Sequence, residues 1–291
     1  MRPLVSAEFF KLRKRMMTWV VAAILVGLVI LLYSVLWSIS GRNSTFGEHH
    51  EFTSQDLRRA LFLQSSVPFS LELVGTFGAI LAMVLAAGAV GSEYSWGTVR
   101  LVATASSGRI RTMLAKFLVV FGLVGIGALL AVFVGVIYSA IITFTNGGSS
   151  LHFVTGSFLS DQLQSYGRTI FVLLPWISLA FAAAVVGRST LAGAGAGIGL
   201  AFMEPLVGGL MRLGDHPWKD IPNYLIGANA QTILQENALP DVLPRFGPGP
   251  EELAKRGAPG PWEAALLLAI YAIVLVSIAF YAYRHRDISA G

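Results

Sequence analysis

Two glutamates, Glu72 and Glu204, lie inside apolar stretches that are long enough to cross a membrane. A carboxylate surrounded by hydrocarbon is costly, and such residues usually pair with a cation or line a substrate path. Both stand near the predicted outer ends of their stretches, at about the level of Arg168 and Arg212. We therefore expect an ion pair with one of these arginines, or a position along a substrate path.

Four glycines alternate with other residues in one apolar stretch, at Gly193, Gly195, Gly197 and Gly199. Their spacing does not match the dinucleotide-binding pattern G-x-G-x-x-G, because Ile198 occupies the place of the third glycine and no strand precedes it. The four residues instead form two overlapping GxxxG pairs, which allow two membrane helices to approach closely. The pattern predicts helix packing.

Three short strings contain residues that could bind a metal. They are His49-His50-Glu51, Glu251-Glu252-x-x-x-Arg256 and Phe46-x-x-x-His50. The last two imitate motifs of intramembrane proteases that process prenylated proteins, in which a metal held within membrane helices activates a water molecule. Here the strings fall in polar segments and in the reverse order. We predict no metal site and no catalytic residue, and an intramembrane metalloprotease remains a minor alternative.

The composition is that of a membrane protein. Of 291 residues, 55% are hydrophobic and 13% charged, and the mean hydropathy is +0.68. An ordinary soluble domain has about 25% charged residues, so the surplus apolar surface must face lipid. The chain has no cysteine and no G-x-x-x-x-G-K-[ST] loop, which excludes disulfides and that nucleotide site. The net charge of +5 is small, and no nucleic-acid partner is expected.

Six stretches reach the roughly 20 apolar residues that a helix needs to cross a bilayer. They are Trp19–Ile39, Leu71–Val90, Phe117–Ile141, Thr169–Gly187, Leu191–Leu210 and Trp262–Tyr283. We predict an all-α polytopic protein with one membrane domain over residues 1–291. Lysine and arginine are densest before the first stretch, in residues 91–116 and after the last stretch. The positive-inside rule then places both termini and residues 91–116 in the cytoplasm.

Three polar segments have distinct patterns. Residues 3–16 carry an apolar stripe (Val5, Phe9, Leu12, Met16) beside a charged one (Glu8, Lys11, Arg15). This pattern predicts an interfacial helix whose basic side chains reach lipid headgroups, or else a positively charged cytoplasmic flank with no further role. Residues 91–116 are basic, with room for a short helix at Thr98–Ala105, and would either project toward another protein or form a solvated loop. Residues 211–261 are predicted to form an extracytoplasmic segment with one or two short helices within 221–239 that dip toward the membrane surface.

The segment between the second and third stretches carries a resemblance. Glu93, then Gly97-Thr98, then Arg109 and finally Lys116 stand in an order similar to that of the membrane subunits of ATP-binding-cassette (ABC) exporters of the type-2 permease family. The turn departs from the family's Pro-x-Ser-Arg form, with Ser106 in the proline place and Gly108 in the serine place. The opening Glu8-Phe9-Phe10-Lys11-Leu12-Arg13 also resembles that family.

The resemblance implies a multi-pass permease of a bacterial plasma membrane that forms a dimer with a second copy or a close paralogue. Two separate ATP-binding subunits would carry ATP and Mg²⁺, and this chain would bind no cofactor. The coupling element seated on the ATPase would contain Glu93, Tyr94, Gly97, Thr98, Arg100 and Arg109. A non-transporting membrane protein of the immunity or sensor type is the main alternative.

Overall fold

The computed structural model describes residues 1–41, 58–59, 61–95, 108–146, 153–237 and 249–285, and within these ranges it contains helices and turns but no strand. The elements are α1 (Arg2–Lys14), α2 (Met16–Ser40), η1 (Leu63–Ser65), α4 (Ser66–Leu73), η2 (Val74–Gly78), α5 (Ala79–Ser95), α7 (Arg109–Thr145), α8 (Gly156–Gly187), α9 (Thr190–Met211), η3 (Ile221–Tyr224), α10 (Ile226–Gln235), α11 (Pro250–Lys255) and α12 (Pro261–His285). The predicted all-α class is confirmed.

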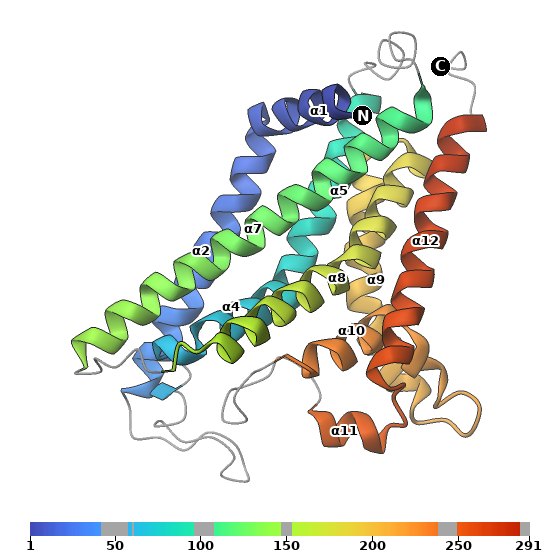
Figure 1. Cartoon of the computed structure of the whole chain (residues 1–291). Coiled ribbons are helices and arrows are strands. Elements are labelled where there is room, and N and C mark those ends of the chain that lie inside the picture. The colour runs from blue at the N-terminus through green and yellow to red at the C-terminus, as the bar shows by residue number, and fades with distance from the viewer. Residues whose placement is uncertain (42–57, 60, 96–107, 147–152, 238–248, 286–291) are drawn as a thin grey trace.

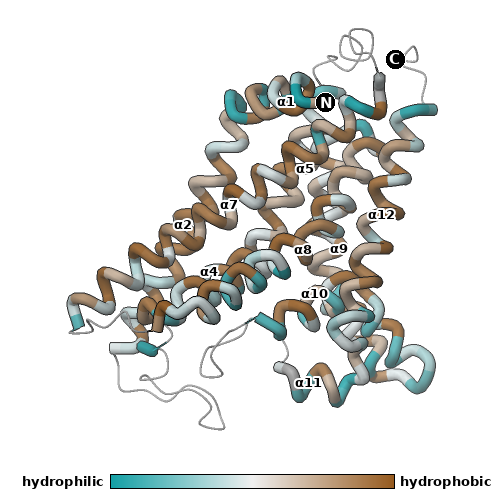
Figure 2. Tube along the Cα trace, in the orientation of Figure 1, coloured by the Kyte–Doolittle hydropathy of each residue, from teal (hydrophilic) through white to brown (hydrophobic). Residues whose placement is uncertain are grey.

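Among the described residues, six helices are long and apolar enough to cross a membrane, as predicted. They cover Met16–Ser40, Leu63–Tyr94, Ile110–Thr145, Gly156–Gly187, Thr190–Met211 and Pro261–His285. Several run beyond the predicted stretches because polar flanking residues continue the helix; the fourth begins at Gly156 rather than Thr169. Figure 2 shows these helices brown through the middle of the molecule and paler or teal toward the two ends.

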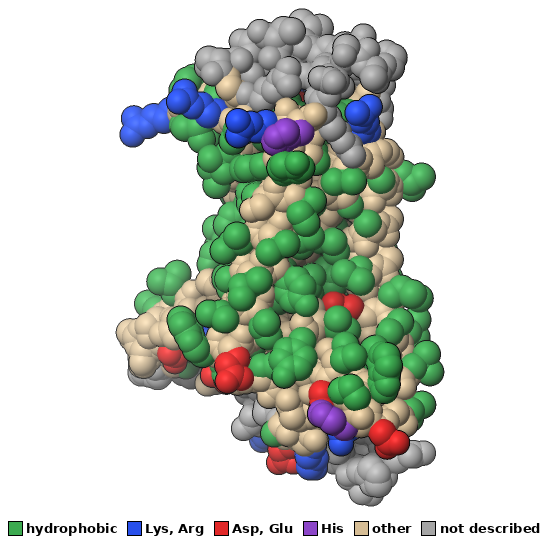
Figure 3. All heavy atoms as spheres, turned by 90° about the vertical axis from the view of Figure 1, so that its right-hand side faces the viewer, with side chains coloured by type: hydrophobic (Ala, Val, Ile, Leu, Met, Phe, Trp, Pro, Cys, Tyr) green, Lys and Arg blue, Asp and Glu red, His purple; other side chains and the backbone are tan. Residues whose placement is uncertain are grey.

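The N-terminus and the last turn of α12 lie at one end of the bundle, together with the last turn of α5 and the first turn of α7 (Figure 1). We call this the terminal end, and the opposite end, where α10 and α11 lie, the far end. Figure 3 shows lysine and arginine gathered at the terminal end, most of the acidic side chains toward the far end, and a largely hydrophobic face between them. This distribution is what a bilayer-spanning protein requires.

The second and fourth spans form the centre of the bundle. About 72% of the most apolar window of the second span and 61% of that of the fourth are buried, against 17% for the first and fifth spans. Large apolar side chains of the outer helices remain exposed, including Ile137, Phe202 and Ile273. In a membrane protein such a surface faces lipid.

The second span is not one regular helix. A π-helical turn, η2, separates α4 from α5. The α4 part packs mainly on α7, whereas the α5 part packs mainly on α8 and α9. At the end of α5, a Cβ atom on Gly91 would lie 2.1 Å from the backbone nitrogen of Thr190, so this crossing with the α8–α9 connection requires glycine.

The fourth and fifth spans, α8 and α9, pack against each other as an antiparallel hairpin. Arg188 ends α8 in the left-handed conformation, with φ 52°, and the Ser189 hydroxyl accepts hydrogen bonds from the backbone nitrogens of Leu191 and Ala192 at 3.0 and 3.3 Å. Ser189 is thus the N-cap of α9. Such caps satisfy amides that have no partner in the first turn of a helix.

Candidate functional site

A cluster of four charged side chains joins three helices at the terminal end. Lys116 of α7 donates to Glu8 of α1 at 2.8 Å and to Glu93 of α5 at 2.7 Å. Lys11 of α1 donates to the same two carboxylates, at 2.7 Å to Glu8 and 2.8 Å to Glu93. Two positive and two negative charges therefore alternate around a closed ring. We call these four residues the charge cluster.

The charge cluster is largely removed from solvent. The side chain of Lys116 is 4% exposed and those of Glu8 and Glu93 are 6% and 9% exposed, whereas that of Lys11 is 35% exposed. Burial alone lowers the pKa of Lys11, but its hydrogen bonds to Glu8 and Glu93 outweigh this, and its pKa is raised above the ordinary value of 10.5. Lys11 is therefore protonated at neutral pH, and the formal charges of two lysines and two glutamates cancel.

A sharp corner between α1 and α2 brings the first helix to the cluster. Arg15 has extended backbone angles, φ −79° and ψ 131°, and separates the two helices. Its guanidinium donates to the Ser92 hydroxyl and to the Gly88 carbonyl of α5. A Cβ atom on Gly88 would lie 2.2 Å from Cε of Met17, so the corner packs directly on the α5 backbone.

The orientation of α1 corrects one prediction. Lys11 and Arg15 were expected to extend to lipid headgroups, but both contact the bundle, and Glu8 is buried on the same side. Phe9 and Met16, from the predicted apolar stripe, are 39% and 81% exposed. The charged stripe faces inward because Glu93 and Lys116 offer it partners in a site with little water.

A second polar site lies toward the far end, around Glu204. Its two carboxylate oxygens accept hydrogen bonds from the backbone nitrogens of Ile226 at 2.8 Å and Gly227 at 2.6 Å. These are the first two residues of α10, and the preceding Leu225 offers no side-chain cap. Glu204 thus caps α10 from a different helix, where unpaired amides and the helix dipole favour a negative charge.

The expected pairing of Glu204 with an arginine is wrong. Arg212 donates to the side-chain oxygen of Asn223 at 3.0 Å, and Arg168 donates to the backbone carbonyl of Glu236. The first two backbone amides of α10, at the positive end of the helix dipole, compensate the Glu204 carboxylate in place of the expected arginine. Glu72, the other candidate, is 3% exposed within α4.

A cavity of about 700 Å³ adjoins Glu204. Its wall includes Trp176, Glu204, Arg212, Gln231 and Arg256 among mainly apolar and small residues. Burial, followed by the neighbouring charge of Arg256, lowers the pKa of Arg212 below its ordinary value. The cavity therefore combines an apolar interior with guanidinium groups at the end of a span.

Comparisons with known proteins place this fold in a family. The sequence model of a family described as "Protein of unknown function (DUF2705)" matches residues 64–289. The chain belongs to the DUF2705 family. It is also 24% identical over 239 residues to "Uncharacterized protein YhcI" of Bacillus subtilis, across 78% of this chain and 68% of the relative. With its six apolar helices, this DUF2705 chain is a multi-pass membrane protein.

The DUF2705 match divides the charge cluster. It covers Glu93 and Lys116 but begins after α1, which carries both Glu8 and Lys11. These residues stand out in the sequence for separate reasons, and the pairing of Lys116 with Glu8 was not predicted, because the two are 108 positions apart. The available signal was an acidic residue at the end of one apolar stretch and a lysine at the start of the next.

Of the predicted coupling residues, Glu93 lies in the charge cluster and the neighbouring Tyr94 is half-buried. Gly97, Thr98 and Arg100 lie outside the described residues, as does the short helix predicted at Thr98–Ala105. Arg109 begins α7, and its side chain lies outside the described part. The predicted loop 91–116 is shorter than expected, because α5 continues to Ser95 and α7 already begins at Arg109.

The glycine pairs divide into an inner and an outer one. A Cβ atom on Gly193 would lie 2.6 Å from that of Ala184, and one on Gly197 would lie 2.7 Å from Sδ of Met83. These two glycines pack α9 against its neighbours, as predicted. Gly195 and Gly199 have no atom within 4 Å of such a Cβ position and lie on the exposed face of α9.

The protease-like strings do not form a metal site among the described residues, where no group of three potential ligands is found. Glu251 and Glu252 are exposed on α11, and Glu252 forms an ion pair with Arg256 one turn later. His49, His50, Glu51 and Phe46 lie outside the described residues.

Proposed function

We propose that this chain is the membrane subunit of an ATP-driven exporter of the type-2 ABC permease family. It would act with a second permease copy or a close paralogue, and with two separate subunits that bind ATP and Mg²⁺. Residues 96–107, between α5 and α7, would form the coupling element. The terminal end would then face the cytoplasm, in agreement with the basic side chains gathered there.

The charge cluster is the observation that carries this proposal. A segment that transmits movement from a partner protein must be held firmly to the helix bundle at both of its ends. Glu93 lies two residues before the end of α5 and Lys116 lies in the second turn of α7, so the cluster ties both ends of the connection to each other. Glu8 and Lys11 tie the same point to α1.

This geometry changes the role proposed for Glu93. Its side chain is buried against two lysines, so a partner would have to open the cluster to touch it. We assign Glu93 a positioning role, in which it fixes the coupling segment, and leave the direct contact with the ATPase to residues 96–107 and Arg109.

The outer glycine pair supports a dimer. Gly195 and Gly199 leave a strip without side chains on the exposed face of α9. Exposed GxxxG pairs in membrane helices permit close contact with another helix. A second permease copy packed on this strip would bury a face that the single chain leaves open.

The test is reconstitution with the ABC-type ATPase encoded nearest to this chain. The two proteins, expressed together and purified through a tag on the permease, are expected to form a complex with two copies of each that hydrolyses ATP. Arg109→Glu should reduce the amount of bound ATPase at least about fivefold, the effect of losing ~1 kcal/mol. Lys255→Glu, an equivalent charge reversal exposed at the far end, should not.

Two results would refute the proposal. One is a folded, membrane-inserted permease that binds no ATPase when the two are expressed together. The other is equal ATPase binding by wild type, Arg109→Glu and Lys255→Glu, because the coupling face would then be wrongly placed.

A further inference from the structure

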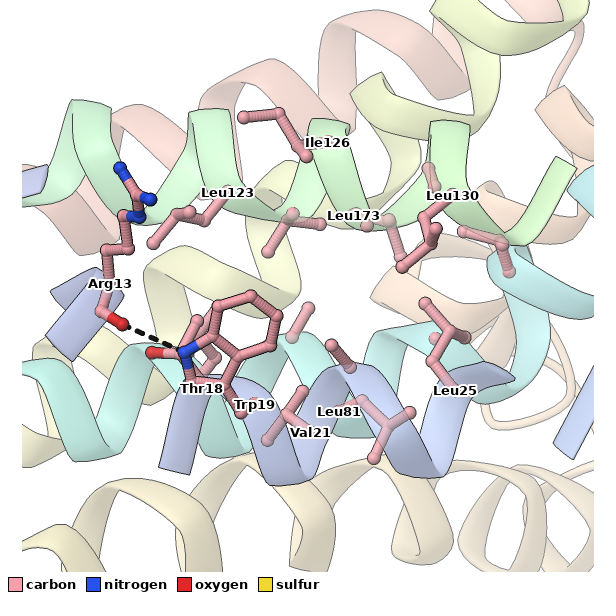
Figure 4. A pocket seen from close by; sticks show the side chains of 18 of the residues that line it. Arg13, Thr18, Trp19, Val21, Leu25, Leu81, Leu123, Ile126, Leu130 and Leu173 are labelled. Carbon is pink, nitrogen blue, oxygen red and sulfur yellow. Dashed lines mark hydrogen bonds between the residues drawn. The ribbon is translucent and has the colours of Figure 1, made fainter. Parts of the chain in front are cut away.

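An apolar pocket of about 280 Å³ opens between α2, α5 and α7, beneath the α1–α2 corner. Figure 4 shows its wall, with Leu25 and Leu81 on one side and Leu123 and Leu130 on the other. The helices α2, α5 and α7 that form the pocket belong to the apolar spans Met16–Ser40, Leu63–Tyr94 and Ile110–Thr145. The pocket therefore lies where lipid chains, rather than water, are available to fill it.

One end of the pocket carries a cation. Arg13 lines this end, and Figure 4 shows its guanidinium beside Leu123. Arg13 is exposed and its guanidinium forms no ion pair with a described residue. No acidic side chain lines the pocket. An occupant with an apolar chain and a negative head would satisfy both the wall and the charge.

Two hydrogen bonds hold this end of the pocket in place. The indole nitrogen of Trp19 donates to the Arg13 carbonyl at 2.9 Å, and the Thr18 hydroxyl donates to the Leu12 carbonyl at 2.7 Å. They fix the Trp19 ring against the corner, where Figure 4 shows it over the pocket. Tryptophan and arginine are the side chains that commonly meet lipid headgroups at a membrane interface.

We propose that this pocket binds an anionic phospholipid, with one acyl chain between α2, α5 and α7 and the phosphate on Arg13. The walls select a flexible hydrocarbon chain because they offer it contact on several sides. The guanidinium selects a phosphate because it donates two parallel hydrogen bonds to such a group. The site is independent of the function proposed above and would exist whether or not the protein transports anything.

Filling the pocket is the direct test. Gly127 lines it, and a Cβ atom there would lie 3.7 Å from Cδ2 of Leu25, so the Gly127→Leu side chain would occupy pocket space. Gly122 is on the same helix, is exposed and has nothing within 4 Å of its Cβ position. Gly122→Leu is therefore a matched control for the change in helix composition.

Native mass spectrometry of the full chain would measure retained lipid, with phosphatidylglycerol and phosphatidylcholine of identical acyl chains supplied at equal amounts. Wild type and Gly122→Leu should retain one phosphatidylglycerol in preference to phosphatidylcholine by about fivefold, the effect of one basic side chain near a membrane surface. Gly127→Leu should retain little of either lipid. Arg13→Gln should lose the preference but keep the binding, whereas Arg2→Gln should change neither.

Equal retention of the two lipids by wild type would overturn the proposal, as would identical lipid binding by Gly127→Leu and Gly122→Leu. If Gly127→Leu does not fold, fluorescence of the wild type and of Trp19→Phe still decides. Lipids brominated on the acyl chain should quench the Trp19 emission, taken as the difference from Trp19→Phe, at lower mole fractions when the headgroup is anionic. Equal quenching by anionic and zwitterionic brominated lipids would count against the site.

Discussion

Replacing Lys116 with methionine removes one positive charge from the buried ring and leaves the remaining groups with a net negative charge. Lys116 contacts both carboxylates and its side chain is 4% exposed. Breaking a buried ion pair by removing one partner typically costs about 3 to 5 kcal/mol, because the other charge is left without compensation. Lys11 still bonds to both carboxylates, so we expect the lower value, ~3 kcal/mol, or about 150-fold in the unfolding equilibrium.

A double-mutant cycle separates this electrostatic effect from packing. Glu93→Gln alone leaves the ring positive, whereas Lys116→Met with Glu93→Gln restores neutrality and keeps the Glu8–Lys11 pair. The double variant should therefore be less destabilised than the sum of the single variants, by about 2 kcal/mol, within the range found for residues in direct contact. Steric trapping in bicelles measures these free energies without removing the protein from a bilayer-like environment.

Lys14→Met is the matched control, since Lys14 is an exposed lysine of the same α1. It should change stability by no more than about 0.5 kcal/mol. The predicted role of the charge cluster is contradicted if Lys116→Met lowers the free energy of unfolding no more than Lys14→Met does. It is also contradicted if the losses in free energy of unfolding from Lys116→Met and Glu93→Gln simply add in the double variant.

Three further predictions concern other parts of the molecule. Gly193→Ala should destabilise the protein by about 2 kcal/mol through overpacking, whereas Gly195→Ala should be neutral or stabilise it by up to about 1 kcal/mol. Thermal unfolding measures both changes in stability, and changes of the same sign would contradict the assignment of an inner and an outer glycine pair. Glu204→Gln leaves one amide of α10 without its charged acceptor and should cost about 1 to 2 kcal/mol, seen as faster proteolysis of residues 211–261 than in wild type or Glu251→Gln. The pKa of Lys11 is raised above 10.5 in the folded protein, so the stability that its charge contributes is complete below pH 10.5 and is lost as the pH rises through the folded-state pKa. The melting temperature should therefore fall more steeply in wild type than in Lys11→Met between about pH 9 and pH 12. Parallel curves of melting temperature against pH would refute this.

The membrane fold was predictable because hydrocarbon imposes a simple rule on sequence. Each span must supply about 20 apolar residues and satisfy its own backbone, so all six helices could be placed from composition alone. Their ends could not. The second span begins at Leu63 rather than Leu71, since weakly polar residues extend a helix once neighbouring helices pack around it.

The polar sites were only partly predictable. Each member of the charge cluster was visible as a charge next to an apolar stretch, but its partner was set by the packing of α1 across α5 and α7. Glu204 was correctly identified as requiring compensation, yet the compensating group was the backbone of α10 and not Arg212. The sequence contained one indication of this, since Leu225, before α10, cannot cap it.

The π-helical turn Val74–Gly78 interrupts the second span, Leu63–Tyr94, close to the middle of its length. On one side of this turn the chain packs with α7, and on the other with α8 and α9. Its residues also divide between the two cavities: Val74 and Gly78 border the lipid-facing pocket, and Gly75 and Thr76 border the cavity beside Glu204. One widened helical turn therefore separates the two cavities. A molecule bound in either cavity contacts a turn that also forms part of the wall of the other cavity.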